Sequence, residues 1–220
     1  MTPNHNRDAA NRRKCGVKKH RATSLHYDFR LEFEDVLLSW VVPDGPSYRA
    51  GEYRIAIRVG DHDPKYLPSE RVIPPGSYGA GPIMLWDIGY WVPLPGYEDI
   101  REGMRNGCLR FMLDCCKLKG IWTLRRRTPM EPGEHTQIWD LIKEPDQFAR
   151  SEDEPDILVE APDSVSTGRT LEEIEQDDNL GTDDRGAFEQ LTLPFPFEPQ
   201  REYRNPSSSQ EMSGDVDGSA

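Results

Sequence analysis

The chain has 220 residues and a formal net charge of −12, and its negative charge is concentrated at one end. Residues 151–220 hold 19 acidic and 4 basic residues, whereas residues 1–150 hold 20 acidic and 23 basic residues, so this mildly basic part does not exclude a nucleic-acid partner. The sequence lacks an apolar stretch of about 18 residues, a secretory signal and CxxC spacing, which leads us to expect a soluble intracellular protein without disulfides or a zinc knuckle.

The first residues of the chain carry no hydrophobic periodicity. We expect residues 1–16 to form a flexible arm and residues 17–150 to form one folded domain, which is long enough to bury a hydrophobic core. The clearest structural pattern begins at Leu25, where apolar residues alternate strictly with His26, Asp28 and Arg30 as far as Phe33. This period of two predicts a strand with one buried face.

Further short strands are predicted along the folded part, at 37–42, 53–59, 83–86, 109–113, 121–126 and 137–143. Turns rich in proline and glycine separate them at 43–46, 74–82 and 93–96, and this pattern is typical of a closed or nearly closed β structure. Helix is expected only at 97–105, with a second short helix at 146–150. From residue 151 to 220 the acidic composition predicts a largely disordered tail.

The polar face of the strand at 25–33 carries the candidate chemistry. His26, Asp28 and Arg30 project from the same side, and a turn could bring His20 back to them. Two imidazoles and a carboxylate suit Mn²⁺, Fe²⁺, Co²⁺ or Zn²⁺, and Arg30 offers a donor fork for phosphate. Taken alone the pattern is weak, because surface histidines in ordinary cross-strand pairs would look the same.

Longer segments make the interpretation more specific. Residues 19–47, KHRATSLHYDFRLEFEDVLLSWVVPDGPS, closely resemble the opening of the 3′-phosphoesterase module of bacterial DNA ligase D and its stand-alone relatives. The resemblance continues through DHDPKY (61–66), IPPGSYGAG (73–81), WDIGYW (86–91), KLKGIWTLRR (117–126), WDLIK (139–143) and SVSTGRTLEEI (164–174).

The resemblance implies a fold and a set of site residues. The implied fold is an eight-stranded β-barrel with a hydrophobic interior and a hydrophilic outer groove, accompanied here by one or two short helices and the acidic tail. The residues that match the family's metal-binding triad, most often filled by manganese, are His20, His26 and Asp28. Those that match phosphate contacts are Arg30, Arg54 and His62, and Tyr66 matches a tyrosine of the active-site network. Without the resemblance, His62 reads as a turn histidine and Tyr66 equally well as a core aromatic.

Two departures from the family pattern stand out. Asp44 occupies the position of a phosphate-binding lysine, and Gly60 occupies that of a glutamate. Losing the lysine removes a charge-assisted contact of roughly 1.5–3 kcal/mol, and the new carboxylate repels phosphate. Arg49, Lys18 and Lys19 are candidates to compensate.

The implied function is removal of 3′-terminal ribonucleotides or 3′-phosphates from DNA ends during repair by non-homologous end joining. The implied partners are DNA 3′ ends, such as a primer-template with a 3′ ribonucleotide, and separate ligase and polymerase proteins. We expect a monomer that does not bind membranes, located with the nucleoid in a bacterium or archaeon or in the nucleus of a eukaryote. The alternative is a family member that has lost catalysis because of Asp44 and Gly60 and only binds nucleic-acid ends or proteins.

Overall fold

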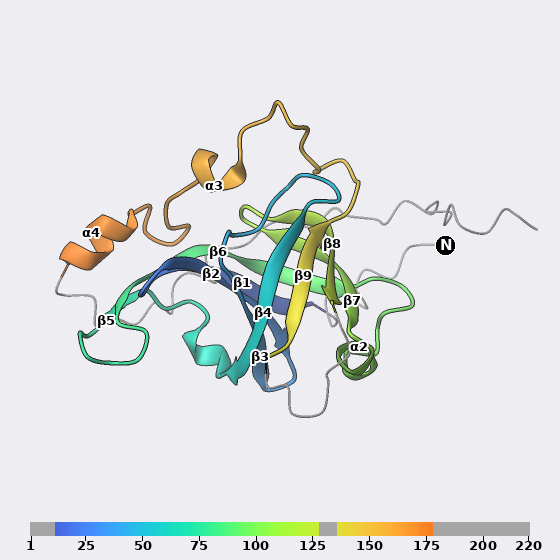
Figure 1. The fold of residues 1–220 in the computed structure, drawn as a ribbon, viewed down its shortest axis with the longest axis horizontal. Helices are drawn as coiled ribbons and strands as arrows, with labels where there is room; N and C mark the ends of the chain where they lie inside the picture. Colours follow the sequence, from blue (N-terminus) through green and yellow to red (C-terminus); the bar gives the residue numbers. More distant parts are fainter. Residues whose placement is uncertain (1–11, 128–135, 178–220) are drawn as a thin grey trace, which may run out of the picture.

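The computed structural model describes residues 12–127 and 136–177. Eight antiparallel strands form a closed barrel in the order β1-β2-β3-β4-β9-β8-β7-β6, and pairing of β1 with β6 closes the ring (Figure 1). The short strand β5 adds to the outer edge of β6. This closed arrangement confirms the predicted eight-stranded barrel.

The strands and helices have the following bounds. The barrel strands are β1 (Arg13–Arg21), β2 (Leu25–Phe33), β3 (Val36–Val42), β4 (Tyr53–His62), β6 (Gly81–Pro93), β7 (Cys108–Cys115), β8 (Lys119–Arg126) and β9 (Ile138–Lys143). The remaining elements are the 3-10 turn η1 (Pro64–Tyr66), strand β5 (Arg71–Ile73), and helices α2 (Ile100–Asn106), α3 (Ile157–Glu160) and α4 (Leu171–Gln176). None of the helices in the described ranges is long and apolar enough to cross a membrane.

Aromatic side chains fill the interior of the barrel. All five tryptophans of the chain are at most 1% exposed, namely Trp40, Trp86, Trp91, Trp122 and Trp139. On β2 the apolar residues Tyr27, Phe29 and Leu31 join this core, as the alternation predicts. The polar residues between them consequently face the outside of the barrel, where the candidate site lies.

The first strand begins earlier than the sequence suggests. β1 starts at Arg13, so residues 13–16 belong to the barrel and not to the expected arm of residues 1–16, whose residues 1–11 lie outside the described part. Cys15 is buried in the core opposite Gly89 of β6, and Gly89 in turn lies opposite Cys115 of β7. The charged residues between these buried positions conceal the strand from hydrophobic pattern analysis.

The segment after residue 150 also differs from the expected tail. Residues 151–177 contain α3 and α4, and Ile157, Leu171 and Ile174 are buried against the core. Three apolar side chains at suitable spacing anchor this acidic segment, although its overall composition resembles disorder. Residues 178–220, the rest of the predicted tail, lie outside the described part.

The remaining helix predictions are partly confirmed. α2 begins at Ile100, three residues after the predicted start, with Asp99 as its N-cap and Gly107 in the left-handed conformation at its end. The predicted helix at 146–150 is absent: the carboxylate of Asp146 instead accepts hydrogen bonds from the backbone N–H groups of Phe148 and Ala149 in a turn. An aspartate that binds nearby backbone amides favours a turn over a helix.

Candidate metal centre

The β1–β2 hairpin brings the two predicted metal-binding histidines together. His20 on β1 lies directly opposite His26 on β2, and their ring centroids are 4.7 Å apart. Asp28 follows two residues after His26 on the same outer face. The potential ligand atoms of the three residues lie within 4.8 Å of one another, so the hairpin gathers the predicted triad at one place.

A backbone carbonyl fixes the orientation of each imidazole. Nε2 of His20 donates a hydrogen bond to the carbonyl oxygen of Gly79 at 2.8 Å, and Nδ1 of His26 donates to that of Ser24 at 3.1 Å. Because a carbonyl oxygen can only accept, the other ring nitrogen of each neutral histidine carries the lone pair. Burial lowers the pKa of His20 below its ordinary value, which favours this neutral form.

The donor set therefore fits a divalent transition metal. It combines two neutral imidazoles with one carboxylate, and each imidazole has the outer hydrogen bond that metal-binding histidines usually have. Nε2 of His26, the nitrogen with the free lone pair, lies 3.7 Å from Oδ1 of Asp28. Ligand type, tautomer and proximity all favour these three residues as the metal-binding site.

Arg30 extends the site along β2. Its guanidinium lies 3.3 Å from Oδ2 of Asp28 and is largely buried, and this burial lowers the pKa of Arg30. The Nε atom of Arg30 is buried and has no hydrogen-bond partner among the described residues. A buried donor of this kind normally has a partner, so Arg30 can offer Nε to an oxygen of a bound ligand.

His62 reaches the same face through a chain of hydrogen bonds. Ser39 lies opposite Arg30 on β3, and its hydroxyl donates to the carbonyl of Leu37 at 2.8 Å. Nδ1 of His62 lies 3.1 Å from the same hydroxyl oxygen and donates to it. This hydrogen bond leaves the lone pair on Nε2 of His62. Burial, and then the positive charge of Arg30, lower the pKa of His62.

Tyr66 and Arg71 form the neighbouring edge of the site. Tyr66 in η1 is partly exposed, and the guanidinium of Arg71 lies 5.3 Å from the centre of its ring. Arg71 is close enough to Arg30 for its charge to contribute to lowering the pKa of Arg30. Sequence analysis missed Arg71, which lies on a strand of only three residues. It also missed Ser39, which lies between apolar residues and could have been found only from its position opposite Arg30.

Arg54 lies at the mouth of the barrel. Its guanidinium lies 2.9 Å from a carboxylate oxygen of Glu52 and 3.8 Å from one of Asp156, and it is 3.5 Å from the carbonyl oxygen of Asp44. Its Nε is buried without a hydrogen-bond partner in the described ranges. The structure thus groups Arg54 with acidic residues at the rim, apart from the cluster formed by the triad, Arg30 and His62.

The residues that were candidates to compensate for Asp44 have other contacts. Arg49 contacts the carbonyl oxygen of Glu152 at 3.5 Å, and Nζ of Lys19 contacts that of Pro162 at 3.2 Å. Lys18 is buried and donates to the carbonyl of Ser69. Gly60, the second departure, is exposed beside a β-bulge, with open space where a side chain would begin.

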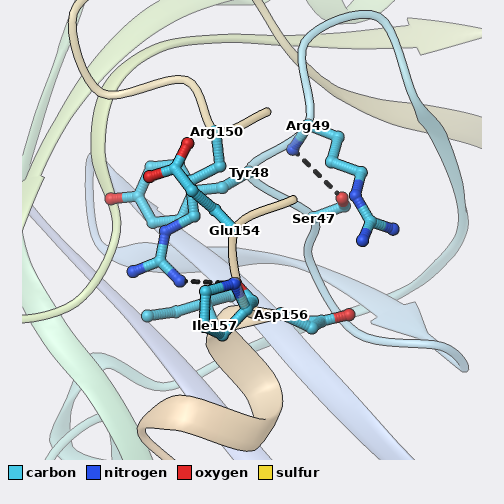
Figure 2. Close-up of a pocket in the computed structure, with 8 residues that line it drawn as sticks. Ser47, Tyr48, Arg49, Arg150, Glu154, Asp156 and Ile157 are labelled. Atoms are coloured by element: carbon cyan, nitrogen blue, oxygen red, sulfur yellow. Dashed lines mark hydrogen bonds between the residues drawn. The ribbon is translucent and has the colours of Figure 1, made fainter. Parts of the chain in front are cut away.

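A small hollow lies away from the triad, at the barrel mouth. Figure 2 shows Arg49 and Arg150 on opposite sides of it. Arg150 lies across the ring of Tyr48 and pairs with Glu160 at 2.5 Å, so the hollow marks the place where the segment after residue 150 covers the barrel. It contains none of the predicted site residues.

Comparison with known proteins adds independent information. Residues 18–126 match the model of the DNA Ligase D 3′-phosphoesterase domain. The multifunctional non-homologous end joining protein LigD of Pseudomonas aeruginosa is 48% identical over 155 residues, which are 70% of this chain and 18% of that protein. The LigD protein of Mycobacterium tuberculosis is 38% identical over 87 residues, which are 40% of this chain and 12% of that protein. The LigD protein of Mycolicibacterium smegmatis is 42% identical over 79 residues, which are 36% of this chain and 10% of that protein. The chain thus spans less than a fifth of each of these relatives.

Proposed function

Because the chain belongs to the DNA ligase D 3′-phosphoesterase domain family, we propose that it is a metal-dependent phosphoesterase that heals DNA 3′ ends. The proposed reactions are removal of a 3′-terminal ribonucleotide and of a 3′-phosphate, in repair by non-homologous end joining. The observation that carries this proposal is the grouping of His20, His26 and Asp28 within 4.8 Å, next to a buried guanidinium. A cation site beside an anion-binding arginine suits a phosphoester.

The proposed cofactor is Mn²⁺ or another divalent transition metal. Nδ1 of His20, Nε2 of His26 and the carboxylate of Asp28 would hold it, since these atoms remain available after the outer hydrogen bonds are made. When bound, such an ion polarises a phosphoryl oxygen and lowers the pKa of a coordinated water.

The remaining residues of the site bind the substrate, move its proton or position the residues that do so. Arg30 donates Nε and its terminal nitrogens to the phosphoryl oxygens, where charge develops during hydrolysis. His62 accepts a proton at Nε2 from the attacking water and returns it to the leaving oxygen, while Ser39 holds its Nδ1. Tyr66 orients Arg71 beside the phosphate. Arg54 contributes its positive charge to binding of the primer strand at the barrel rim.

The proposed substrate partner is a DNA 3′ end, such as a primer-template with a 3′ ribonucleotide. Ligase and polymerase activities would complete the repair after a clean 3′-hydroxyl has been made. The named relatives are bacterial, so the proposed place of action is the nucleoid. We propose that the protein acts as a monomer, because the site is built from the elements of one chain.

The test is incubation of the purified chain with Mn²⁺ and a primer-template that ends in one ribonucleotide. We expect shortening of the primer to a 3′-hydroxyl end, with loss of activity in EDTA and no cleavage of an otherwise identical all-DNA primer. Binding of the end without trimming over a wide range of protein concentrations would contradict the proposal. That result would instead favour a protein that only binds DNA ends.

A further inference from the structure

A fully exposed aromatic residue lies in the loop whose backbone contacts the metal centre. Tyr78 is 103% exposed, more than any other large hydrophobic residue in the described ranges. It occupies a corner of the loop that joins β5 to β6, in a turn closed by a 3.2 Å hydrogen bond from Ala80 N–H to the carbonyl of Ser77. Gly79 follows it with φ +73°, a conformation that favours glycine and allows the tight turn at this corner.

This loop is fixed to the site by two contacts. The carbonyl of Gly79, the next residue after Tyr78, accepts the 2.8 Å hydrogen bond from Nε2 of His20. At Gly81 the loop passes so close to β1 that an added Cβ would lie 2.0 Å from the carbonyl oxygen of Arg21. The backbone of Tyr78 is therefore fixed one residue away from the contact that orients His20, and its side chain is free to meet a ligand.

Electric charge differs between the two ends of the site. Towards Tyr66, Arg71 is near enough to Arg30 for its positive charge to lower the pKa of Arg30, and both cations attract phosphate. Beyond His20, Arg21 pairs with Glu172 at 2.6 Å and with Glu175 at 2.5 Å, so the acidic helix α4 neutralises the cation at that end. The phosphates of a DNA strand thus favour the Arg30 end, whereas the Tyr78 end suits an uncharged group.

We propose that Tyr78 stacks on the terminal nucleobase of a 3′ end whose last phosphodiester lies at the metal centre. The strand approaches over the arginines, the terminal phosphodiester reaches the triad, and the terminal nucleoside, which has no further phosphate, lies under the ring. An exposed tyrosine is a suitable surface for this contact, because every base has a face that can stack on an aromatic ring. This inference rests on the proposed function and makes Tyr78 a determinant of preference for 3′-ribonucleotides over 3′-phosphates, which have no base beyond the scissile bond.

The test compares two substrates in the wild type, Tyr78→Ala and Tyr78→Trp. For Tyr78→Ala we expect the ratio of kcat/KM for a 3′-ribonucleotide end to that for a 3′-phosphate end to fall roughly tenfold. Tyr78→Trp should keep or raise the ratio. Tyr53→Ala is the matched control, because Tyr53 is also exposed and its ring lies 5.6 Å from the guanidinium of Arg125, not at the metal-ligand cluster; the ratio should stay at the wild-type value.

A third substrate, whose 3′-terminal ribonucleotide has the sugar and its 5′ phosphodiester but no base, isolates the stacking contact. Wild type and Tyr78→Ala should cleave it at equal rates, because the base that the ring contacts is missing. Equal losses on the ribonucleotide and the 3′-phosphate, or a loss that persists on the abasic end, would overturn the inference while leaving the proposed function intact.

Failure of the proposed function has a different outcome, in which the wild type cleaves none of the three ends. Fluorescence of a terminal 2-aminopurine then tests the stack by itself. Quenching on binding that is lost in Tyr78→Ala supports the inference, and quenching that the variant retains overturns it.

Discussion

The outer face that carries the triad and the mouth of the barrel use the same residue types in different ways. At the mouth, the charge of Arg54 is offset by Glu52 and Asp156, and that of Arg150 by Glu160. On the outer face, Arg30 shares its carboxylate partner Asp28 with two imidazoles whose lone pairs remain available. A cation bound there would draw on the charge of Asp28 and leave Arg30 free to bind an anion. Charge pairing at the mouth therefore joins the covering segment to the barrel, whereas the outer face keeps donor atoms available for the proposed ligand.

The largest expected effect is that of His26→Ala. Without this ligand the metal site is incomplete, and we expect the turnover of a 3′-ribonucleotide end to fall on the order of 1,000-fold, because both charge stabilisation and water activation are lost. Steady-state cleavage with added Mn²⁺ measures the effect, and circular dichroism checks that the barrel has folded. Hydrolysis at the wild-type rate would refute the assignment of the triad.

A pair of arginines compares the two regions directly. Arg30→Ala should lower kcat/KM roughly 100-fold, because a preorganised donor to the developing charge is removed. Arg150→Ala should lower the Tm while kcat/KM stays within about twofold, because its partners Pro155 and Glu160 only hold the covering segment in place. Similar losses of activity in both variants would remove the distinction between the outer face and the mouth.

Asp44→Lys tests the departure from the family pattern at the boundary of the two regions. It restores the cation that the family usually has, and we expect roughly tenfold tighter binding of a 3′-phosphate end, with a steeper dependence on salt. Asp35→Lys is the control: it changes the net charge equally, in the turn between β2 and β3. If Asp44→Lys binds no better than wild type, Asp44 is not the cause of weak phosphate binding.

Among the variants that change the candidate site itself, Ser39→Ala should have the smallest effect. Loss of the hydroxyl frees Nδ1 of His62 and weakens control of its tautomer, so we expect kcat to fall roughly 2- to 10-fold with little change in KM. The pH–rate profile should change shape, because the protonation of His62 is no longer coupled to Ser39. Ser39→Thr, which keeps a hydroxyl, should recover most of the activity; an equal loss in both variants would indicate a packing defect.

The alternation of side chains between the two faces of β4 shows where reasoning from sequence fails. Arg54 and His62 are an even number of residues apart, so a regular strand would place them on the same face. Between Leu37 and Ser39 of β3, however, β4 contains an extra residue, since Leu37 pairs with His62 and Ser39 with Val59. This bulge turns His62 outward, while Arg54 stays on the side of the buried Ala56. A bulge depends on strand pairing, which a sequence does not display.

The sequence by itself determined the local features of this protein. Alternation on β2 placed His26, Asp28 and Arg30 on one outward face, and the resemblance carried by segments along the chain indicated the barrel and the family. These features depend on neighbouring residues or on long contiguous segments, so they are visible without a structure.

Tertiary structure alone decided which distant groups complete the site. Gly79 reaches His20 through the β5–β6 loop, Ser39 reaches His62 across a strand pair, and α4 places its glutamates against Arg21. The same holds for residues 151–177, where three buried side chains outweigh an acidic composition. Each of these contacts joins residues that are far apart in the chain, and their free energy depends on register and burial, which exist only once the barrel has closed.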